Sequence, residues 1–195
     1  MKKMDKDSDA YEKLSLFIGR YILTFQYVES KIDQMLLLAT DLNRWHVGQT
    51  LLARMGYRQK VDALSAIVHS SKIARGTEHQ RAWTESFDRL VKRLQDEGTR
   101  RNDIVHSLHM FEFVKIGAPV LRSRRSSNSK GFTVRNVEVD ETEFDKIMAQ
   151  IAMLFMDANF AHVQLVHWYD DLGHQGERAQ KKQSRGDEPT RGAEG

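Results

Sequence analysis

Apolar residues recur along residues 11–41 with the spacing of an amphipathic helix. The recurring positions lie alternately four and three residues apart, at Leu14, Ile18, Tyr21, Phe25, Val28, Ile32, Met35 and Ala39. An α-helix has about 3.6 residues per turn, so this spacing places all of them on one side of one helix. More apolar residues lie beside this seam, at Phe17, Ile22, Leu36, Leu37 and Leu38. The sequence therefore predicts a long helix with a second apolar face, which packs inside a bundle or against another copy of the chain.

Three later segments have the same helical period. Apolar residues recur every three or four positions in residues 58–74 and again in the segment that begins near Glu78. The last segment starts at Asp140, a favourable N-cap, and continues to about Leu172. Residues 43–56 are predicted to be a connector between the first two helices. The predicted fold class is all-α, an up-and-down bundle of four to five helices.

The apolar pattern becomes extended just before the last helix. Residues 110–116 and 120–122 are predicted to be short strands, and residues 132–139 alternate apolar and polar side chains as a half-exposed strand does. The polar run between them, residues 123–131, is predicted to be a basic loop. We therefore expect a small β-hairpin insertion near residues 109–139, within a helical domain that spans residues 11–172.

Composition narrows the protein class. Residues 1–10 are polar and residues 173–195 hold almost no large apolar residue, so a flexible N-terminus and a disordered C-terminal tail are expected. The chain has no cysteine, which excludes disulfides and thiolate chemistry. No apolar run approaches the roughly 20 residues that cross a bilayer, and no signal-type block follows the start. We expect a cytoplasmic protein without membrane contact, whose net charge of +3 permits a nucleic-acid partner.

One short stretch concentrates the candidate chemistry of the chain. Arg101, Asn102 and His106 are polar groups separated by the β-branched apolar residues Ile104 and Val105. The apolar pair favours burial and would hold the polar groups in place. Arginine binds phosphoryl oxygens with a fixed fork of donors, and histidine accepts or donates a proton near neutral pH. The stretch therefore combines an anion-binding group with an acid–base group.

The residues before this stretch predict a helix start. Gly98 and Thr99 indicate a helix break followed by an N-cap. The polar groups would then lie near a helix N-terminus, which attracts anions. The role of His106 has two open interpretations: an acid–base group, or a structural histidine whose ring nitrogens bond to the backbone inside the core.

The order Arg101, Asn102 and His106 resembles the signature of the HEPN superfamily, in which four to six residues separate an arginine from a histidine. A polar residue often follows that arginine directly, as Asn102 does here. HEPN domains are small helical bundles, many of them metal-independent ribonucleases, and their motif stands before a long last helix. The resemblance covers roughly residues 11–172. It implies an RNA endonuclease in which Arg101, Asn102 and His106 are catalytic and no cofactor is needed.

The resemblance also implies products and partners. The RNA 2′-hydroxyl would attack its own phosphorus and leave a 2′,3′-cyclic phosphate and a 5′-hydroxyl. Two motifs would face one cleft in a homodimer, since one motif offers few catalytic groups. A toxin or defence effector with an antitoxin or regulatory partner fits this chemistry. The alternative is a non-catalytic HEPN module that binds RNA, nucleotides or a protein partner.

Further cations are candidate RNA contacts. Arg100 adjoins the motif, and Arg122, Arg124, Arg125 and Lys130 belong to the basic loop. Cations on a flexible loop suit a polyanion, although an ordinary solvated hairpin has the same composition. The choice between the two interpretations stays open.

Other chemistries have weaker signals. His162 and His167 are five residues apart on a predicted helix, which is poor spacing for two metal ligands, and no His-Glu-x-x-His pair occurs. No metal site is therefore predicted. Glu29 and Asp33 lie four residues apart on the first helix. They form a solvated acidic patch, or Glu29 meets an arginine near the motif.

Overall fold

The computed structural model describes most of the chain. Its backbone is described for residues 6–39, 45–71, 76–110, 120–128 and 131–186. The side chains of these residues are described apart from those of residues 6–8, 45, 124–135 and 170–186.

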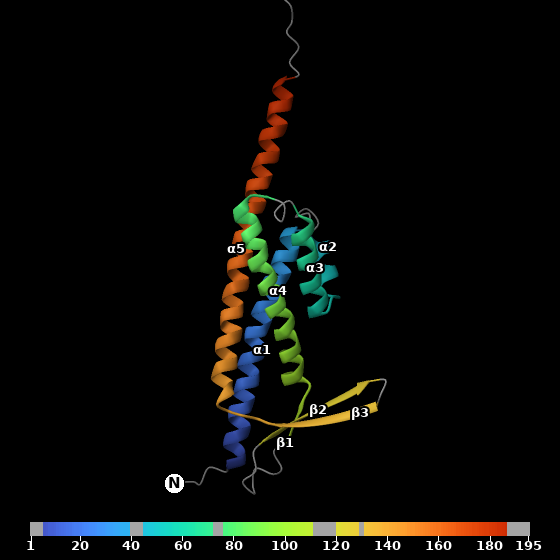
Figure 1. The fold of residues 1–195 in the computed structure, drawn as a ribbon, viewed down its shortest axis with the longest axis vertical. Coiled ribbons are helices and arrows are strands. Elements are labelled where there is room, and N and C mark those ends of the chain that lie inside the picture. Colours follow the sequence, from blue (N-terminus) through green and yellow to red (C-terminus); the bar gives the residue numbers. More distant parts are fainter. Residues whose placement is uncertain (1–5, 40–44, 72–75, 111–119, 129–130, 187–195) are drawn as a thin grey trace, which may run out of the picture.

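The described residues form five helices and a small sheet, arranged as an up-and-down bundle (Figure 1). The elements in chain order are α1 (Lys6–Ala39), α2 (Trp45–Leu52), α3 (Tyr57–Ser70), α4 (Glu78–Val105), β1 (Leu108–Met110), β2 (Leu121–Asn128), β3 (Gly131–Glu138) and α5 (Glu143–Gly186). Helices α1 and α5 run in the same direction, because Phe17 stacks on Phe144 and Tyr27 lies near Phe155. Helix α4 runs the opposite way beside them. The predicted all-α bundle with a β insertion before the last helix is confirmed.

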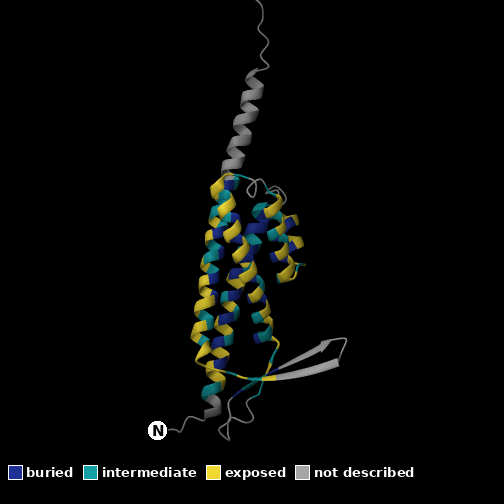
Figure 2. Cartoon of the chain, viewed as in Figure 1, coloured by how far each residue is buried: buried dark blue, intermediate teal, exposed yellow. Residues whose placement is uncertain are grey.

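The core is built from the residues that the apolar period selects. Tyr21, Ile32 and Met35 of α1 are fully buried, as are Leu64 of α3 and Leu165 of α5. Burying one such side chain contributes about 1.5–3 kcal/mol to folding, so the bundle is held mainly by these seams. Figure 2 shows the same alternation of buried and exposed positions along each helix.

The β insertion is a three-stranded antiparallel sheet in the order β1-β2-β3. Strand β3 lies where residues 132–139 were predicted to be extended. Strand β1 includes the first residue of the strand predicted at 110–116, and the remaining residues of that prediction lie outside the described residues. The prediction of a basic loop at residues 123–131 is wrong at residues 123–128 and at Gly131, which belong to β2 and β3, and residues 129–130 lie outside the described residues. Strand β2 pairs with β3 from Leu121 to Asn128, because ladder hydrogen bonds use the backbone and do not depend on apolar side chains.

The helix ends differ from the prediction in three places. Helix α1 begins at Lys6, inside the segment predicted to be flexible. The short helix α2 occupies the predicted connector. Helix α5 continues to Gly186, so the prediction of disorder from residue 173 is wrong over residues 173–186. No proline occurs there, and glutamine, lysine and arginine are good helix formers without an apolar stripe.

Helix α4 passes through Gly98 without a break, which overturns the predicted helix start at Thr99. Gly98 is buried, and a Cβ atom there would lie 2.7 Å from Cδ1 and Cε1 of the Tyr57 ring. The hydroxyl of Tyr57 donates to the Leu94 carbonyl oxygen at 3.0 Å, which holds the ring along α4. The glycine therefore marks close packing of α3 on α4. The helix starts instead at the N-cap Thr77, whose Oγ1 accepts a hydrogen bond from the Gln80 N–H.

We predict that Gly98→Ala destabilises the fold, although alanine favours helices. The new methyl group collides with Tyr57, and overpacking of this kind costs about 1–3 kcal/mol, more than the gain of about 1 kcal/mol in helix propensity. Thermal unfolding at low protein concentration, followed by circular dichroism, measures the change. Gly19→Ala is the matched control, because a Cβ atom at Gly19 meets nothing within 4 Å. That control should unfold at a slightly higher temperature than the parent. An equal rise for both variants would contradict the packing role of Gly98.

Candidate functional site

The Arg101–His106 stretch lies at the C-terminal end of α4. His106 is the C-cap residue, and its N–H donates to the Asn102 carbonyl oxygen at 3.0 Å. The predicted location at a helix N-terminus is therefore wrong. The carbonyl end of a helix carries partial negative charge and favours cations, so the helix dipole does not help to hold a phosphate here. Anion binding at this end depends on side chains.

Arg101 is oriented by two neighbours. Its Nη1 donates to Asn102 Oδ1 at 3.0 Å, and its Cζ lies 5.7 Å from the centre of the Phe25 ring of α1. An arginine over an aromatic ring gains a cation–π interaction. The side-chain amide and the ring together restrict where the guanidinium points. Arg101 and Asn102, which are adjacent in sequence, are therefore also bonded through their side chains.

Arg101 and Asn102 line an open groove of ≈ 630 Å³ between α1, α3 and α4. Phe25 and Glu29 of α1 form part of its wall, and Tyr57 and Arg58 of α3 form another. The side chains along α4 are polar, at Gln95, Asp96, Thr99, Arg101 and Asn102. Both signs of charge occur in the groove. It can therefore accept a polar ligand that carries charges of either sign.

His106 lies outside the residues that line this groove. Its side chain is exposed, so the interpretation as a buried structural histidine is wrong. It follows Asn102 by four residues, which places the two side chains about 40° apart and roughly 6 Å along the axis. Ile104 is 3% exposed, and it anchors the turn as the sequence predicts. His106 is thus accessible to solvent one turn beyond the groove.

Arg100 belongs to a polar network that reaches from the buried Glu97 to the surface. Its Nη1 lies 3.1 Å from Glu97 Oε2 and donates to Gln150 Oε1 of α5 at 2.9 Å. Glu97 is 5% exposed, and its other carboxylate oxygen accepts a hydrogen bond from the Tyr21 hydroxyl at 2.6 Å. Burial and the Glu97 carboxylate raise the pKa of Tyr21 far above its usual range. Arg100 therefore holds α4, α1 and α5 together, rather than pointing freely toward a ligand.

Glu97 is a residue that the sequence analysis missed. Glu97 follows Leu94 by three positions and precedes Arg101 by four, so it continues the buried stripe of α4. The sequence signal that could have identified Glu97 is a glutamate at a core-facing position of a helix. Such a residue needs a partner, because an unpaired buried carboxylate is costly.

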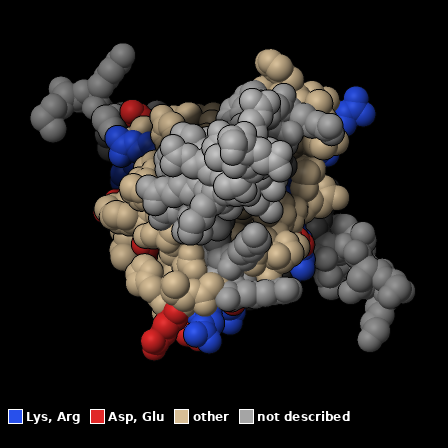
Figure 3. All heavy atoms as spheres, turned by 90° about the horizontal axis from the view of Figure 1, so that it is seen from above, with Lys and Arg blue, Asp and Glu red and all other residues tan. Residues whose placement is uncertain are grey.

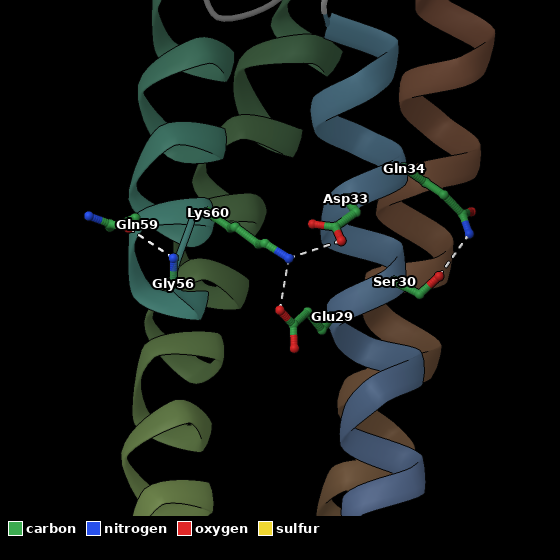
Figure 4. Close-up of polar contacts among 7 residues, drawn as sticks. All are labelled: Glu29, Ser30, Asp33, Gln34, Gly56, Gln59 and Lys60. Carbon is green, nitrogen blue, oxygen red and sulfur yellow. Dashed lines mark hydrogen bonds and ion pairs between the residues drawn. The ribbon is translucent and has the colours of Figure 1, made fainter. Parts of the chain in front are cut away.

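A second missed residue is Lys60, which joins α3 to α1 (Figure 4). Its Nζ lies 2.8 Å from Glu29 Oε1 and 3.0 Å from Asp33 Oδ2, and its side chain is 8% exposed. The acidic pair is therefore neither a solvated patch nor a contact of Glu29 with an arginine near the motif. Because Glu29 also lines the groove, this triad fixes one wall of it.

The Lys60 triad holds one positive charge against two negative charges. Although burial opposes its charge, the bonds to Glu29 and Asp33 raise the pKa of Lys60. Burial raises the pKa of Asp33 in spite of the bond from Lys60. The raised pKa of Lys60 means that its charge adds stability, whereas the raised pKa of Asp33 means that its charge costs stability. One cation cannot neutralise two carboxylates, so we conclude that ionising Asp33 costs stability while protonated Lys60 adds it.

The sheet presents a separate small pocket of ≈ 220 Å³. Arg122 lines it opposite His109, its antiparallel partner residue on β1. Burial, and then the charge of Arg122, lower the pKa of His109. Arg124 and Arg125 lie on β2, but their side chains are outside the described residues, and so is Lys130. Of the predicted RNA-binding cations, Arg100 and Arg122 are the two whose side chains the structure describes, and they lie in different surroundings.

Where grey atoms do not cover this end of the bundle in Figure 3, Lys and Arg lie scattered among Asp, Glu and uncharged residues. Among the described residues, no group of three or more His, Asp or Glu side chains is placed to hold a metal ion.

None of the described helices has the length and apolarity that crossing a lipid bilayer requires.

Comparison with known proteins identified no relative. No family model, no curated protein and no solved structure matched this chain. The resemblance to the HEPN superfamily therefore stays a prediction that rests on the motif and its position before the last helix.

We predict that Lys60→Met destabilises the fold and that adding Asp33→Asn restores part of the loss. Removing one partner of a fully buried ion pair costs about 3–5 kcal/mol. Both carboxylates here are about one-third exposed, so we expect roughly 1–3 kcal/mol. Urea unfolding at neutral pH measures both changes. Equal stability of the single and double variants would contradict the assigned cost of ionising Asp33.

The same triad predicts a pH dependence. The folded chain binds a proton at Asp33 more readily than the unfolded chain, whose Asp33 has the ordinary pKa of 3.8. The Asp33 contribution to stability therefore increases as pH falls from neutral toward that value. Asp33→Asn lacks this contribution, because asparagine does not titrate. The difference in urea midpoint between the variant and the parent should therefore change between neutral and acidic pH as the parent gains the stability that the variant lacks.

Proposed function

We propose that this chain is a metal-independent RNA endonuclease of the HEPN type. The observation that supports the proposal best is the bonded pair of Arg101 and Asn102, which lines an open groove one turn before the exposed His106. An arginine fork held by an amide suits a phosphodiester, and an exposed histidine can exchange protons with a substrate. The substrate would lie across the end of α4, with one phosphate between Arg101 and His106.

The reaction needs few groups. His106 would take the proton of the RNA 2′-hydroxyl as that oxygen forms a bond to the adjacent phosphorus. The bond from phosphorus to the 5′-oxygen breaks, and the leaving oxygen takes up a proton. The products are a 2′,3′-cyclic phosphate and a 5′-hydroxyl, with no redox change and no added cofactor.

Arg101 would stabilise the charge that builds on the phosphoryl oxygens. Its guanidinium has five N–H donors, and the bond to Asn102 uses one of them. The Phe25 ring and Asn102 restrict the guanidinium before substrate binds, so less freedom is lost in the transition state. Asn102 thus serves mainly to position Arg101.

A binding module without catalysis is the competing function. The groove carries the carboxylates of Glu29 and Asp96 beside Arg58 and Arg101. Mixed charge suits a protein segment better than a polyanion, since RNA phosphates are repelled by carboxylates. In this alternative the groove binds a protein partner, and His106 has no chemical role.

Partners and location follow from the proposal. A ribonuclease of this kind would act in the cytoplasm as a toxin or defence effector, with an antitoxin or regulatory protein to restrain it. The HEPN resemblance implies a homodimer with two motifs in one cleft, in which a second histidine would protonate the leaving oxygen. In any arrangement that keeps the two motifs apart, water supplies that proton instead.

We predict that His106→Ala lowers RNA cleavage by about 10²- to 10⁴-fold, the usual cost of losing a general acid–base group. RNA affinity should change little, because the side chain carries no fixed charge. Arg101→Ala should lower both rate and affinity, since it removes a permanent cation. The measurement is an RNA digest with both variants, with product ends identified by mass spectrometry.

Two controls make this digest decisive. Thr99→Ala changes another groove residue and should cut at close to the parental rate. Excess EDTA should leave parental cleavage unchanged, whereas loss of cleavage in EDTA would transfer the chemistry to a metal. A His106→Ala protein that is folded and cuts RNA at the parental rate would refute the proposed mechanism.

We predict that Lys130 and the cations of β2 contribute to RNA binding through phosphates. Neutralising Arg122, Arg124, Arg125 and Lys130 should weaken RNA binding and reduce the salt dependence of the binding constant, because fewer counterions are released. Cleavage by saturating enzyme should be largely spared. Titrations at several salt concentrations measure this slope. An unchanged slope would leave these residues as ordinary solvated side chains of the sheet.

A further inference from the structure

Large apolar residues are exposed along the outer side of α5 over about three turns, and exposed positions follow this helix in Figure 2. Met153, Met156, Phe160 and Val163 are spaced three, four and three residues apart, and each is at least 46% exposed. Within residues 147–169 the one Asp, Glu, Lys or Arg is Asp157. Its carboxylate pairs with Arg93 of α4. A solvent-facing helix normally carries charges on its outer side, so this stripe differs from an ordinary surface.

Helix α1 extends the same surface. Leu16, Leu23 and Tyr27 are 53%, 58% and 61% exposed, and they lie seven and four residues apart on one side of the helix. The Tyr27 ring lies 6.0 Å from the Phe155 ring of α5, so the two stripes adjoin. We call this surface the α1–α5 face, comprising Leu16, Leu23, Tyr27, Met153, Met156, Phe160 and Val163.

The α1–α5 face and the Arg101 groove lie on different sides of the bundle. Phe25 and Glu29 line the groove. Leu23 and Tyr27 each precede one of them by two residues, which is about 200° around a helix. A partner on the α1–α5 face would therefore leave the groove open.

Gly19 supplies a second, independent observation. It lies between Leu16 and Leu23 on the exposed side of α1, and a Cβ atom there would meet nothing within 4 Å. Glycine weakens a helix interior relative to alanine, and no neighbour within the described chain requires it. A second helix crossing α1 closely at this point would require it, because only a small residue lets two backbones approach.

We propose that the α1–α5 face pairs with the same face of a second copy of this chain, which leaves both Arg101 grooves on the outside of the dimer. The seven large side chains are each 46–66% exposed, and together they expose an area on the order of the ~800 Å² that one partner buries in a stable interface. The largest apolar patch on a typical monomer is smaller, about 300–600 Å².

The chemistry of the face favours a second copy over other occupants. Apart from Arg20, an exposed residue of α1 between Leu16 and Leu23, the face is apolar, so pairing it with itself brings few charges together. A membrane surface attracts helices that carry many cations beside the apolar stripe, and residues 147–169 contain no Lys or Arg. The proposal does not depend on whether the groove cleaves RNA. It differs from a shared-cleft dimer, in which pairing would cover the grooves.

Sedimentation of the full chain at micromolar concentrations tests the proposal. The parent should sediment at twice its 22.6 kDa. Phe160→Glu places a charge in the interface, and Gly19→Leu blocks the helix crossing, so each should raise the dimer dissociation constant by roughly 10- to 100-fold. Leu51→Glu is the matched control, because Leu51 is 60% exposed but lies on α2. It should remain a dimer.

Circular dichroism establishes that each variant is folded. Met153→Lys replaces Phe160→Glu if the latter does not fold, because Met153 is also strongly exposed. A monomeric parent would overturn the proposal and leave the face to a different partner. A parental dimer that survives the face variants but dissociates with Arg58→Glu, at the groove, would also overturn it and favour the shared-cleft arrangement.

Discussion

The buried carboxylate of Glu97 is the constraint on which the arrangement of this bundle depends. It lies among apolar side chains of α4, where an unpaired charge would be strongly destabilising. The Tyr21 hydroxyl of α1 and the Arg100 guanidinium satisfy it, and Arg100 also reaches Gln150 of α5. Three helices must therefore meet in one register for Glu97 to be tolerated. Arg101 is the next residue after Arg100, so the register that satisfies Glu97 also places Arg101 over Phe25.

The bundle separates two kinds of surface. On the side where α1, α3 and α4 meet, polar and charged residues form a groove whose wall is held by Lys60 between Glu29 and Asp33. On the outer side of α1 and α5, large apolar residues are exposed in two adjoining stripes. Ligand binding and self-association would then use different surfaces. A chain that pairs through the apolar side keeps its groove accessible, and each copy must carry out any chemistry with its own Arg101, Asn102 and His106.

Sequence periodicity was sufficient to predict the helical core, because burial follows the 3.6-residue period of a helix wherever a long seam exists. Tyr21, Ile32 and Met35 are buried as that period requires. The motif residues were also recognisable, since Arg101, Asn102 and His106 are close in sequence. Their position at the C-terminal end of a helix was not predictable. Gly98 indicates a helix break when considered alone, and its true reason is the Tyr57 ring from another helix.

Other features depend on pairings between distant parts of the chain. Lys60 has the sequence signature of an exposed lysine, and its burial follows from two carboxylates 27 and 31 residues away. Strand β2 has the composition of a loop, and it is extended because β3 supplies its hydrogen-bond partners. The continuation of α5 to Gly186 reflects backbone propensity, which an apolar pattern does not report. Single-residue patterns do not contain these pairings, so they became visible only in the folded chain.

The central claim is that the Arg101–Asn102 pair and His106 act together on one phosphodiester. Nuclear magnetic resonance of the full chain, with an RNA oligonucleotide that lacks the attacking 2′-hydroxyl, tests it most directly. Such an RNA binds without being cut. The account predicts that the guanidinium signals of Arg101 and the imidazole signals of His106 shift together and saturate at the same RNA concentration. Shifts at Arg101 with an unperturbed His106, or no shift at either residue, would contradict it.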